Sequence, residues 1–190
     1  MTESEIDNCL KDREVMFNDR KIIINNLKNI GLINDEYACD VLIDSLLMKR
    51  KGKREIYKVL KEKKIKEDII SKSMDNIDDE VYKDNFTKVC EKYLKMYNGK
   101  SSKVKDNMVR QKLKEYGYEE SLINSFGVEY DRESDIELAR KFLLKILKNN
   151  SITISDHQNI NKIKAKLANK GFNYDIINLV IGEVINDETY

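Results

Sequence analysis

The chain has 190 residues, enough for one hydrophobic core or for a few small modules in a row. Charged residues make up 36% and hydrophobic residues 41%, proline is absent and only seven glycines occur, so the composition favours an all-α protein of exposed amphipathic helices. Lys and Arg outnumber Asp and Glu by only one (35 against 34), so net charge alone predicts only weak binding of the whole chain to nucleic acid.

Several classes of protein are not expected from the residue pattern. No run of about 18 apolar residues occurs and the N-terminus is polar and acidic, so we expect no membrane span, no signal peptide and a cytoplasmic location. The cysteines Cys9, Cys39 and Cys90 lack the spacing of a metal or redox pair, and we interpret them as small buried thiols. The single histidine, His157, stands at an expected helix start, and no Gly-rich phosphate loop occurs. We therefore expect neither an enzyme nor a cofactor or metal.

Residues 1–34 open the chain. Residues 1–14 are polar, and we expect them to be irregular. From Val15 onward, apolar residues recur at i, i+4 and i+7 and predict a helix that ends at Gly31: Ile23, Leu27 and Ile30. We interpret residues 1–34 as a polar N-terminus followed by the closing helix of a truncated first repeat.

Three segments follow, 35–77, 78–127 and 131–186, each with the pattern of three short amphipathic helices. Acidic triplets stand where each first helix begins, at 34–36 (NDE), 78–80 (DDE) and 131–133 (DRE). We interpret these acids as caps that also favour the positive end of the helix dipole. The expected helices include 35–48, 53–63, 67–74 and 104–116, and a break is expected at 149–151 (NNS).

A fixed period relates the three segments. The stretches VLKEKKI (59–65), KLKEYGY (112–118) and KLANKGF (166–172) align, and their last residues are 53 and 54 positions apart (118 − 65 and 172 − 118). Apolar residues then coincide in columns: Leu60, Leu113 and Leu167; Ile69, Leu122 and Ile176; Ile70, Ile123 and Ile177. Matching columns at one period predict tandem three-helix repeats, each with the same small core and each stacked on its neighbour.

The middle helix of every repeat is basic. Residues 49–65 (KRKGKREIYKVLKEKKI) hold nine Lys or Arg against two Glu. A solvated helix face explains any one such helix, but its threefold recurrence favours a stripe that meets a polyanion or an acidic groove on a protein. The candidate binding residues are Lys49, Arg50, Lys51, Lys53, Arg54, Lys58, Lys61, Lys105, Arg110, Lys112, Lys114, Lys162, Lys166 and Lys170. The third helices are acidic or apolar at their starts, which disfavours sequence-specific DNA reading by a helix-turn-helix.

These motifs together resemble the RecX family, regulators of the RecA recombinase. The resemblance rests on GLINDEYA (31–38), KGKREIYKVLKEKKI (51–65), EDII (67–70), IDDE (77–80) and KLKEYGYEESLI (112–123), and covers roughly residues 15–126. Lys64 stands where the family usually has Gly, which Gly117 and Gly171 keep. The family usually has a complete repeat before GLINDEYA, of which only the last helix is evident in this chain.

The resemblance implies an elongated, curved array of helices that lies in the groove of the RecA–DNA filament, and we expect the chain to be a monomer. It would lower strand exchange and ATP hydrolysis in DNA repair and the SOS response, bind single- or double-stranded DNA only weakly, and need no catalytic residue or cofactor. Two other hypotheses stay open: a general nucleic-acid-binding module, and a helical scaffold for a different acidic protein. A hydrolase with an unrecognised site is a minor alternative.

Overall fold

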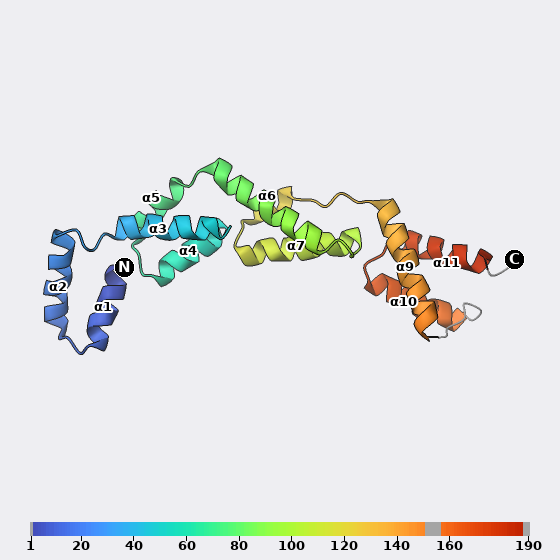
Figure 1. Ribbon diagram of the computed structural model, residues 1–190, viewed down its shortest axis with the longest axis horizontal. Coiled ribbons are helices and arrows are strands. Elements are labelled where there is room, and N and C mark those ends of the chain that lie inside the picture. Colours follow the sequence, from blue (N-terminus) through green and yellow to red (C-terminus); the bar gives the residue numbers. More distant parts are fainter. Residues whose placement is uncertain (1, 151–156, 188–190) are drawn as a thin grey trace. The chain divides into compact units, whose positions relative to one another are not determined.

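Helices make up all of the regular structure in residues 2–150 and 157–187, which the computed structural model describes (Figure 1). None of the helices in this part of the chain is both long enough and apolar enough to cross a membrane. In chain order they are α1 (Glu3–Asp12), α2 (Phe17–Asn29), α3 (Asp35–Met48), α4 (Lys53–Glu62), α5 (Glu67–Asp75), α6 (Asp79–Met96), α7 (Ser102–Tyr116), α8 (Glu120–Ser125), α9 (Arg132–Asn150), α10 (His157–Asn169) and α11 (Tyr174–Asp187).

The chain divides into two compact units. The first contains Met1–Glu91 together with Leu113–Ile123, and the second contains Lys92–Lys112 together with Asn124–Tyr190. In the first unit α3, α4 and α5 pack against one another, and in the second α9, α10 and α11 do so. The helices α6 and α7 supply residues to both units, so the boundary between the units falls inside the middle triplet.

The expected helices are confirmed from residue 17 onward, to within a few residues at their ends. The break expected at 149–151 falls at the end of α9, and Ser151 lies outside the described residues. The irregular structure expected for residues 1–14 was wrong, because these residues contain the helix α1. Thr2 and Glu5 form a capping box at its start, a signal that the sequence TESE carries.

The repeat columns form the core. Leu60, Leu113 and Leu167 are 0% exposed, and the isoleucines of the 70–123–177 column are 2% exposed or less. The column that ends the aligned stretches, Ile65, Tyr118 and Phe172, is also buried. In the 69–122–176 column only the last residue is fully buried. The interpretation of the columns as repeated core positions is therefore confirmed at these sites.

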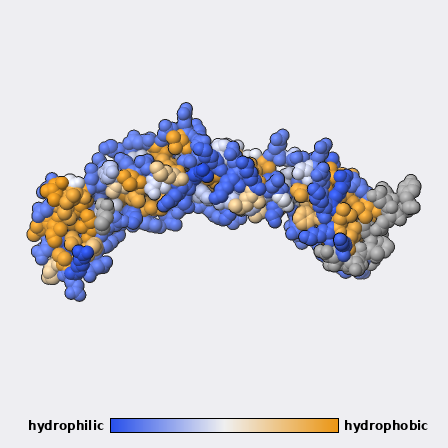
Figure 2. Space-filling view, viewed as in Figure 1, coloured by the Kyte–Doolittle hydropathy of each residue, from blue (hydrophilic) through white to orange (hydrophobic). Residues whose placement is uncertain are grey.

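The hairpin of α1 and α2 occupies the place of the second and third helices of a repeat. Ile6 and Leu10 align with Ile56 and Leu60, so more than the closing helix of the first repeat is present, which corrects the earlier interpretation. Unlike their counterparts, Ile6 and Leu10 are only half-buried. Hydrophobic surface is visible over this hairpin in Figure 2. The core of the first repeat is thus less complete than the others.

A polar pair replaces part of the core in this hairpin. Arg20 occupies the column that holds a buried Ile in the other repeats. Its Nε donates to Asp7 Oδ1 at 2.8 Å and its Nη1 donates to the carbonyl of Val15 at 3.1 Å. Since burying a guanidinium requires such partners, Asp7 accounts for how an arginine is accepted at this position.

Each second helix ends in a residue with left-handed backbone. These residues are Glu14 (φ 60°), Lys64 (φ 56°), Gly117 (φ 85°) and Gly171 (φ 83°). The turn they form lets the next residue, such as Ile65, donate its N–H to a carbonyl of the last helical turn, Leu60 O at 3.3 Å. Glycine adopts this conformation without strain, whereas a residue with a Cβ does not.

We expect Lys64→Gly to raise the free energy of unfolding by roughly 0.5–1 kcal/mol, because relief of left-handed strain exceeds the extra chain entropy of glycine. Urea denaturation followed by circular dichroism measures the change. Lys58→Gly, an exposed position inside α4, is the matched control and should instead lower stability by about 1 kcal/mol. A loss of stability in both variants would contradict the assignment of strain to Lys64.

One type of joint links successive repeats. The start of each second helix meets the last turn of the second helix in the next repeat. Thr2 Oγ1 donates to Lys63 O at 3.4 Å, Gly52 N–H to Tyr116 O at 2.7 Å, and Ser101 Oγ to Lys170 O at 3.0 Å.

The first helix of the next repeat accepts a second hydrogen bond at each joint. The pairs are Glu3 N–H to Asp35 Oδ1 (2.9 Å), Lys53 N–H to Tyr82 OH (3.0 Å) and Ser102 N–H to Asp135 Oδ1 (2.9 Å). The joints fix where the basic second helices begin.

Candidate interaction surface

The basic segment with the highest local charge, residues 49–54, connects α3 to α4. It lies at the joint where Gly52 bonds to Tyr116. Its backbone is held on both sides. Tyr118, which is fully buried, donates its hydroxyl to the carbonyl of Arg50 at 2.9 Å, and Arg50 itself has left-handed backbone (φ 58°). Gly52 N–H and Arg54 N–H donate to carbonyls of Tyr116 and Gly117 at 2.7 and 3.0 Å. The segment is thus a fixed platform for its side chains.

Two of these cations are engaged with aromatic rings of the same unit. The Nζ of Lys51 lies 5.3 Å from the ring centre of Tyr116, and that of Lys53 lies 4.9 Å from Tyr82. Lys53 also pairs with Asp79 at 3.6 Å. Lys49 and Arg54 are exposed and form no ion pair with any residue that the structure describes. They are the cations of this segment most available to a partner.

The N-terminus of α4 is not an open anion site, although basic residues surround it. The N–H groups of Lys53, Arg54 and Glu55 donate to Tyr82 OH, Gly117 O and Gly52 O respectively. A phosphate or carboxylate would therefore be bound by side chains rather than by the free N–H groups that a helix start usually offers.

Further along α4, the candidate residues carry intrahelical or neighbouring partners. Lys58 is exposed and lies 3.9 Å from Glu62. Lys61 donates to Glu67 at 2.9 Å, and this hydrogen bond raises the pKa of Lys61 and lowers that of Glu67. Lys114, also in the first unit, lies 3.9 Å from Glu120. Such exposed pairs contribute little to stability, so these cations can exchange one anionic partner for another.

In the second unit the candidates differ in whether they are available to a partner. Arg110 is engaged within the unit. Its Nε donates to Asp106 at 2.7 Å, and its guanidinium donates to the carbonyl of Phe126 and lies over the ring of Phe126. Lys112 is half-buried and has a partner within the described residues. Lys170 lies 5.4 Å from the ring centre of Phe142. The exposed candidates on the same unit are Lys162, Lys166 and Lys170.

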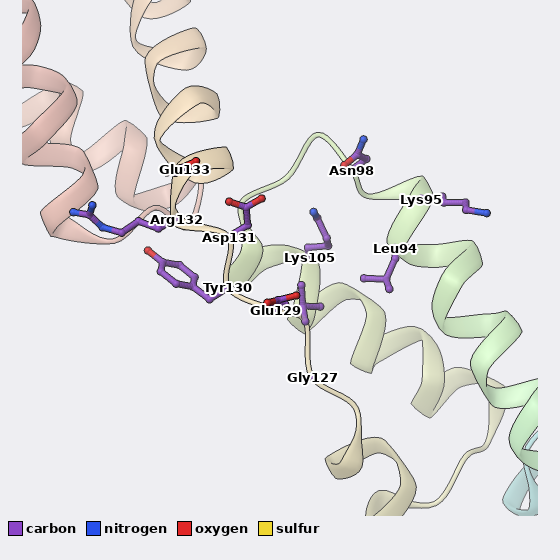
Figure 3. Close-up of a pocket in the computed structure, with 11 residues that line it drawn as sticks. Leu94, Lys95, Asn98, Lys105, Gly127, Glu129, Tyr130, Asp131, Arg132 and Glu133 are labelled. Atoms are coloured by element: carbon purple, nitrogen blue, oxygen red, sulfur yellow. The ribbon is translucent and has the colours of Figure 1, made fainter.

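Lys105 lies in a pocket of about 820 Å³ that also belongs to the second unit (Figure 3). Its lining includes three bases, Lys95, Lys105 and Arg132, and three acids, Glu129, Asp131 and Glu133. Two of these groups already have partners within the protein. Asp131 Oδ1 accepts the N–H of Ser134 at 3.0 Å, and Arg132 lies 3.5 Å from Asp175. With balanced charge, the pocket does not select an anionic ligand.

The acidic helix starts act as caps, as expected. Asn34 Oδ1 accepts the N–H of Tyr37 at 3.0 Å, Asp78 Oδ1 accepts that of Glu80 at 2.7 Å, and Asp131 caps α9 as described above. The interpretation of these residues as caps is confirmed. Asp78 and Asp131 nevertheless keep their exposed carboxylates at the surface.

No constellation in the described residues suggests catalysis. No group of three or more metal-ligating side chains occurs there. Cys39 and Cys90 are buried and Cys9 is half-buried, so the expectation of buried thiols holds for two of the three. Burial raises the pKa of Cys90 to about 11, which keeps it protonated and unreactive at neutral pH. His157 is the first residue of α10, as expected.

Comparison with known proteins identifies similar sequences. A family model described as the third three-helix domain of RecX matches residues 133–181. The regulatory protein RecX of Lactococcus lactis is 30% identical over 185 residues, which are 93% of this chain and 68% of that protein. The regulatory protein RecX of Clostridioides difficile is 29% identical over 180 residues, 87% of this chain and 82% of that protein. These matches extend the likeness beyond residues 15–126, where the motifs first suggested it.

A solved structure has the same fold. The crystal structure of RecX from Lactobacillus salivarius superposes with a TM-score of 0.61 at 23% identity, over 65% of this chain and 81% of that one. The all-α fold of tandem three-helix repeats is therefore confirmed.

Proposed function

The chain belongs to the RecX family, and on that basis we propose that it binds the filament of the RecA recombinase on DNA and lowers its activity. The relatives are regulatory proteins by name, which supports a regulator rather than an enzyme. Such a regulator would act in the cytoplasm, on strand exchange and on ATP hydrolysis by the recombinase.

The observation that carries this proposal beyond family membership is the fixed basic segment at the start of α4. Its backbone is held by Tyr118 and by the α7 end, while Lys49 and Arg54 are exposed. Cations on a rigid platform bind an acidic surface or phosphates at a lower entropic cost than cations on a mobile loop.

The direct test is the rate of ATP hydrolysis by RecA on single-stranded DNA while this protein is titrated in. Inhibition supports the proposal, and inhibition at protein concentrations far below that of RecA indicates capping of filament ends. Unchanged hydrolysis and strand exchange would contradict it and favour a scaffold for another protein.

We expect the double variant Lys49→Glu with Arg54→Glu to weaken filament binding at least tenfold, because it replaces two exposed cations by anions on an unchanged backbone. Filament binding is measured by co-sedimentation with RecA on single-stranded DNA. Lys141→Glu with Lys145→Glu, two exposed residues of α9 outside the candidate set, is the charge-matched control. Equal losses in both variants would show that only total charge matters.

A general nucleic-acid-binding module makes a different prediction for the same variants. It would bind bare DNA tightly, with an affinity that falls steeply as salt rises. Retained binding to bare DNA, together with no dependence on RecA, would favour that alternative.

A further inference from the structure

A groove between α3 and α6 of the first unit carries negative charge, whereas residues 49–54 carry positive charge. Two adjoining depressions of about 320 and 310 Å³ share Asp44, Leu47 and Val81 in their linings. The amide of Asn85 on α6 donates to the carbonyl of Leu47 at 3.0 Å and ties the two helices together along the groove. The groove is therefore a fixed feature of this unit.

The groove offers apolar anchoring points. Met48 lies at the end of α3 and is 84% exposed, and Val81 on α6 is 48% exposed. Leu47 also lines this part of the groove. A methionine side chain adapts its shape to a partner, which suits a surface that receives a side chain from another molecule.

All charge in the groove is negative. Of the lining residues, every one of which is described, Asp40, Asp44 and Asp78 are acidic and none is Lys or Arg, in a chain with 35 such residues. Asp40 and Asp44 stand one helical turn apart, where like charges destabilise a helix slightly. Neither forms an ion pair within the described residues. A cationic partner would relieve this repulsion.

We propose that this groove binds a basic segment of the recombinase that carries one apolar anchor residue. The apolar side chain enters between Met48 and Val81, while Lys or Arg side chains on either side meet Asp40, Asp44 and Asp78. The negative charge of the groove repels the phosphates of DNA, so this contact is to protein alone. The inference rests on the proposed function and specifies a second surface for it, separate from residues 49–54.

The experiment compares binding of three variants to RecA filaments on single-stranded DNA by co-sedimentation. We expect Met48→Glu to weaken binding fivefold or more by removing the anchor. Asp44→Lys should do the same by repelling the basic segment. Leu144→Glu, which changes another exposed apolar residue, on α9, is the control and should bind like the unchanged protein.

A cross-linking measurement identifies the occupant. With a photo-reactive benzoylphenylalanine in place of Met48, the cross-linked recombinase peptide should contain at least two Lys or Arg within four residues of the site. Cross-linking to DNA, or to an acidic peptide, would overturn the inference.

The two proposals fail in distinguishable ways. If the unchanged protein does not bind the filament, the proposed function is wrong. If it binds and loses affinity on Lys49→Glu with Arg54→Glu, while Met48→Glu and Asp44→Lys bind normally, only the groove inference is wrong.

Discussion

Gly52→Ala is expected to lower the free energy of unfolding by about 3 kcal/mol, as overpacking against rigid atoms does. A Cβ at Gly52 would lie 2.3 Å from the carbonyl group of Gly117 and from the N atom of Tyr118. These are backbone atoms of the joint, which cannot turn aside as a flexible side chain can. The backbone conformation of Gly52 is ordinary, with φ −78°, so the whole cost is steric.

Thermal and urea unfolding of this variant measure the effect. Gly127→Ala is the matched control, because a Cβ there meets no atom within 4 Å, and we expect a change within about 0.5 kcal/mol. Equal stability of the two variants would show that the joint opens without cost. Since α4 begins at Gly52, the same variant should also weaken filament binding by displacing Lys49 and Arg54.

Leu60→Ala, Leu113→Ala and Leu167→Ala are each expected to lower the free energy of unfolding by about 3 kcal/mol, the typical cost of the cavity left by a fully buried leucine. The equivalent change at Leu10, which is only half-buried, should cost about 1 kcal/mol. Chemical denaturation of the four variants tests the repeat column directly. A cost at Leu10 as large as at Leu60 would mean that the α1–α2 hairpin is covered in solution.

Sequence periodicity predicted the helices and their core well, because both follow from the spacing of apolar residues along the chain. Leu60, Leu113 and Leu167 recur at a fixed period, and each is 0% exposed. Leu167 packs in a cluster of buried residues from its own repeat, such as Leu143 and Ile177. The helix α1 was missed because its polar residues outweighed a short stripe of Ile6 and Leu10. The capping box of Thr2 and Glu5 was the signal that could have identified it.

Contacts between distant residues could not be read from the sequence. Gly52 falls between two expected helices, 35–48 and 53–63, and only the structure shows that it permits close approach to Gly117. Arg110 belonged by sequence to the basic face, yet Asp106 and Phe126 engage it inside the second unit. The acidic groove combines α3 and α6 residues more than 30 positions apart, such as Met48 and Val81 (81 − 48), so no local motif marks it.

The joint also bears on how sequences in this family can diverge. At each joint the acceptor in the last turn of a second helix is a main-chain carbonyl: that of Lys63, Tyr116 or Lys170. Every amino acid supplies this carbonyl, so the side chains there are free to change while the bond persists. Evolution can therefore replace the outward residues of each repeat, and with them the choice of partner, without redesigning the way that neighbouring repeats connect. A protein that shares only 30% of its residues with this chain can keep the same connections for that reason.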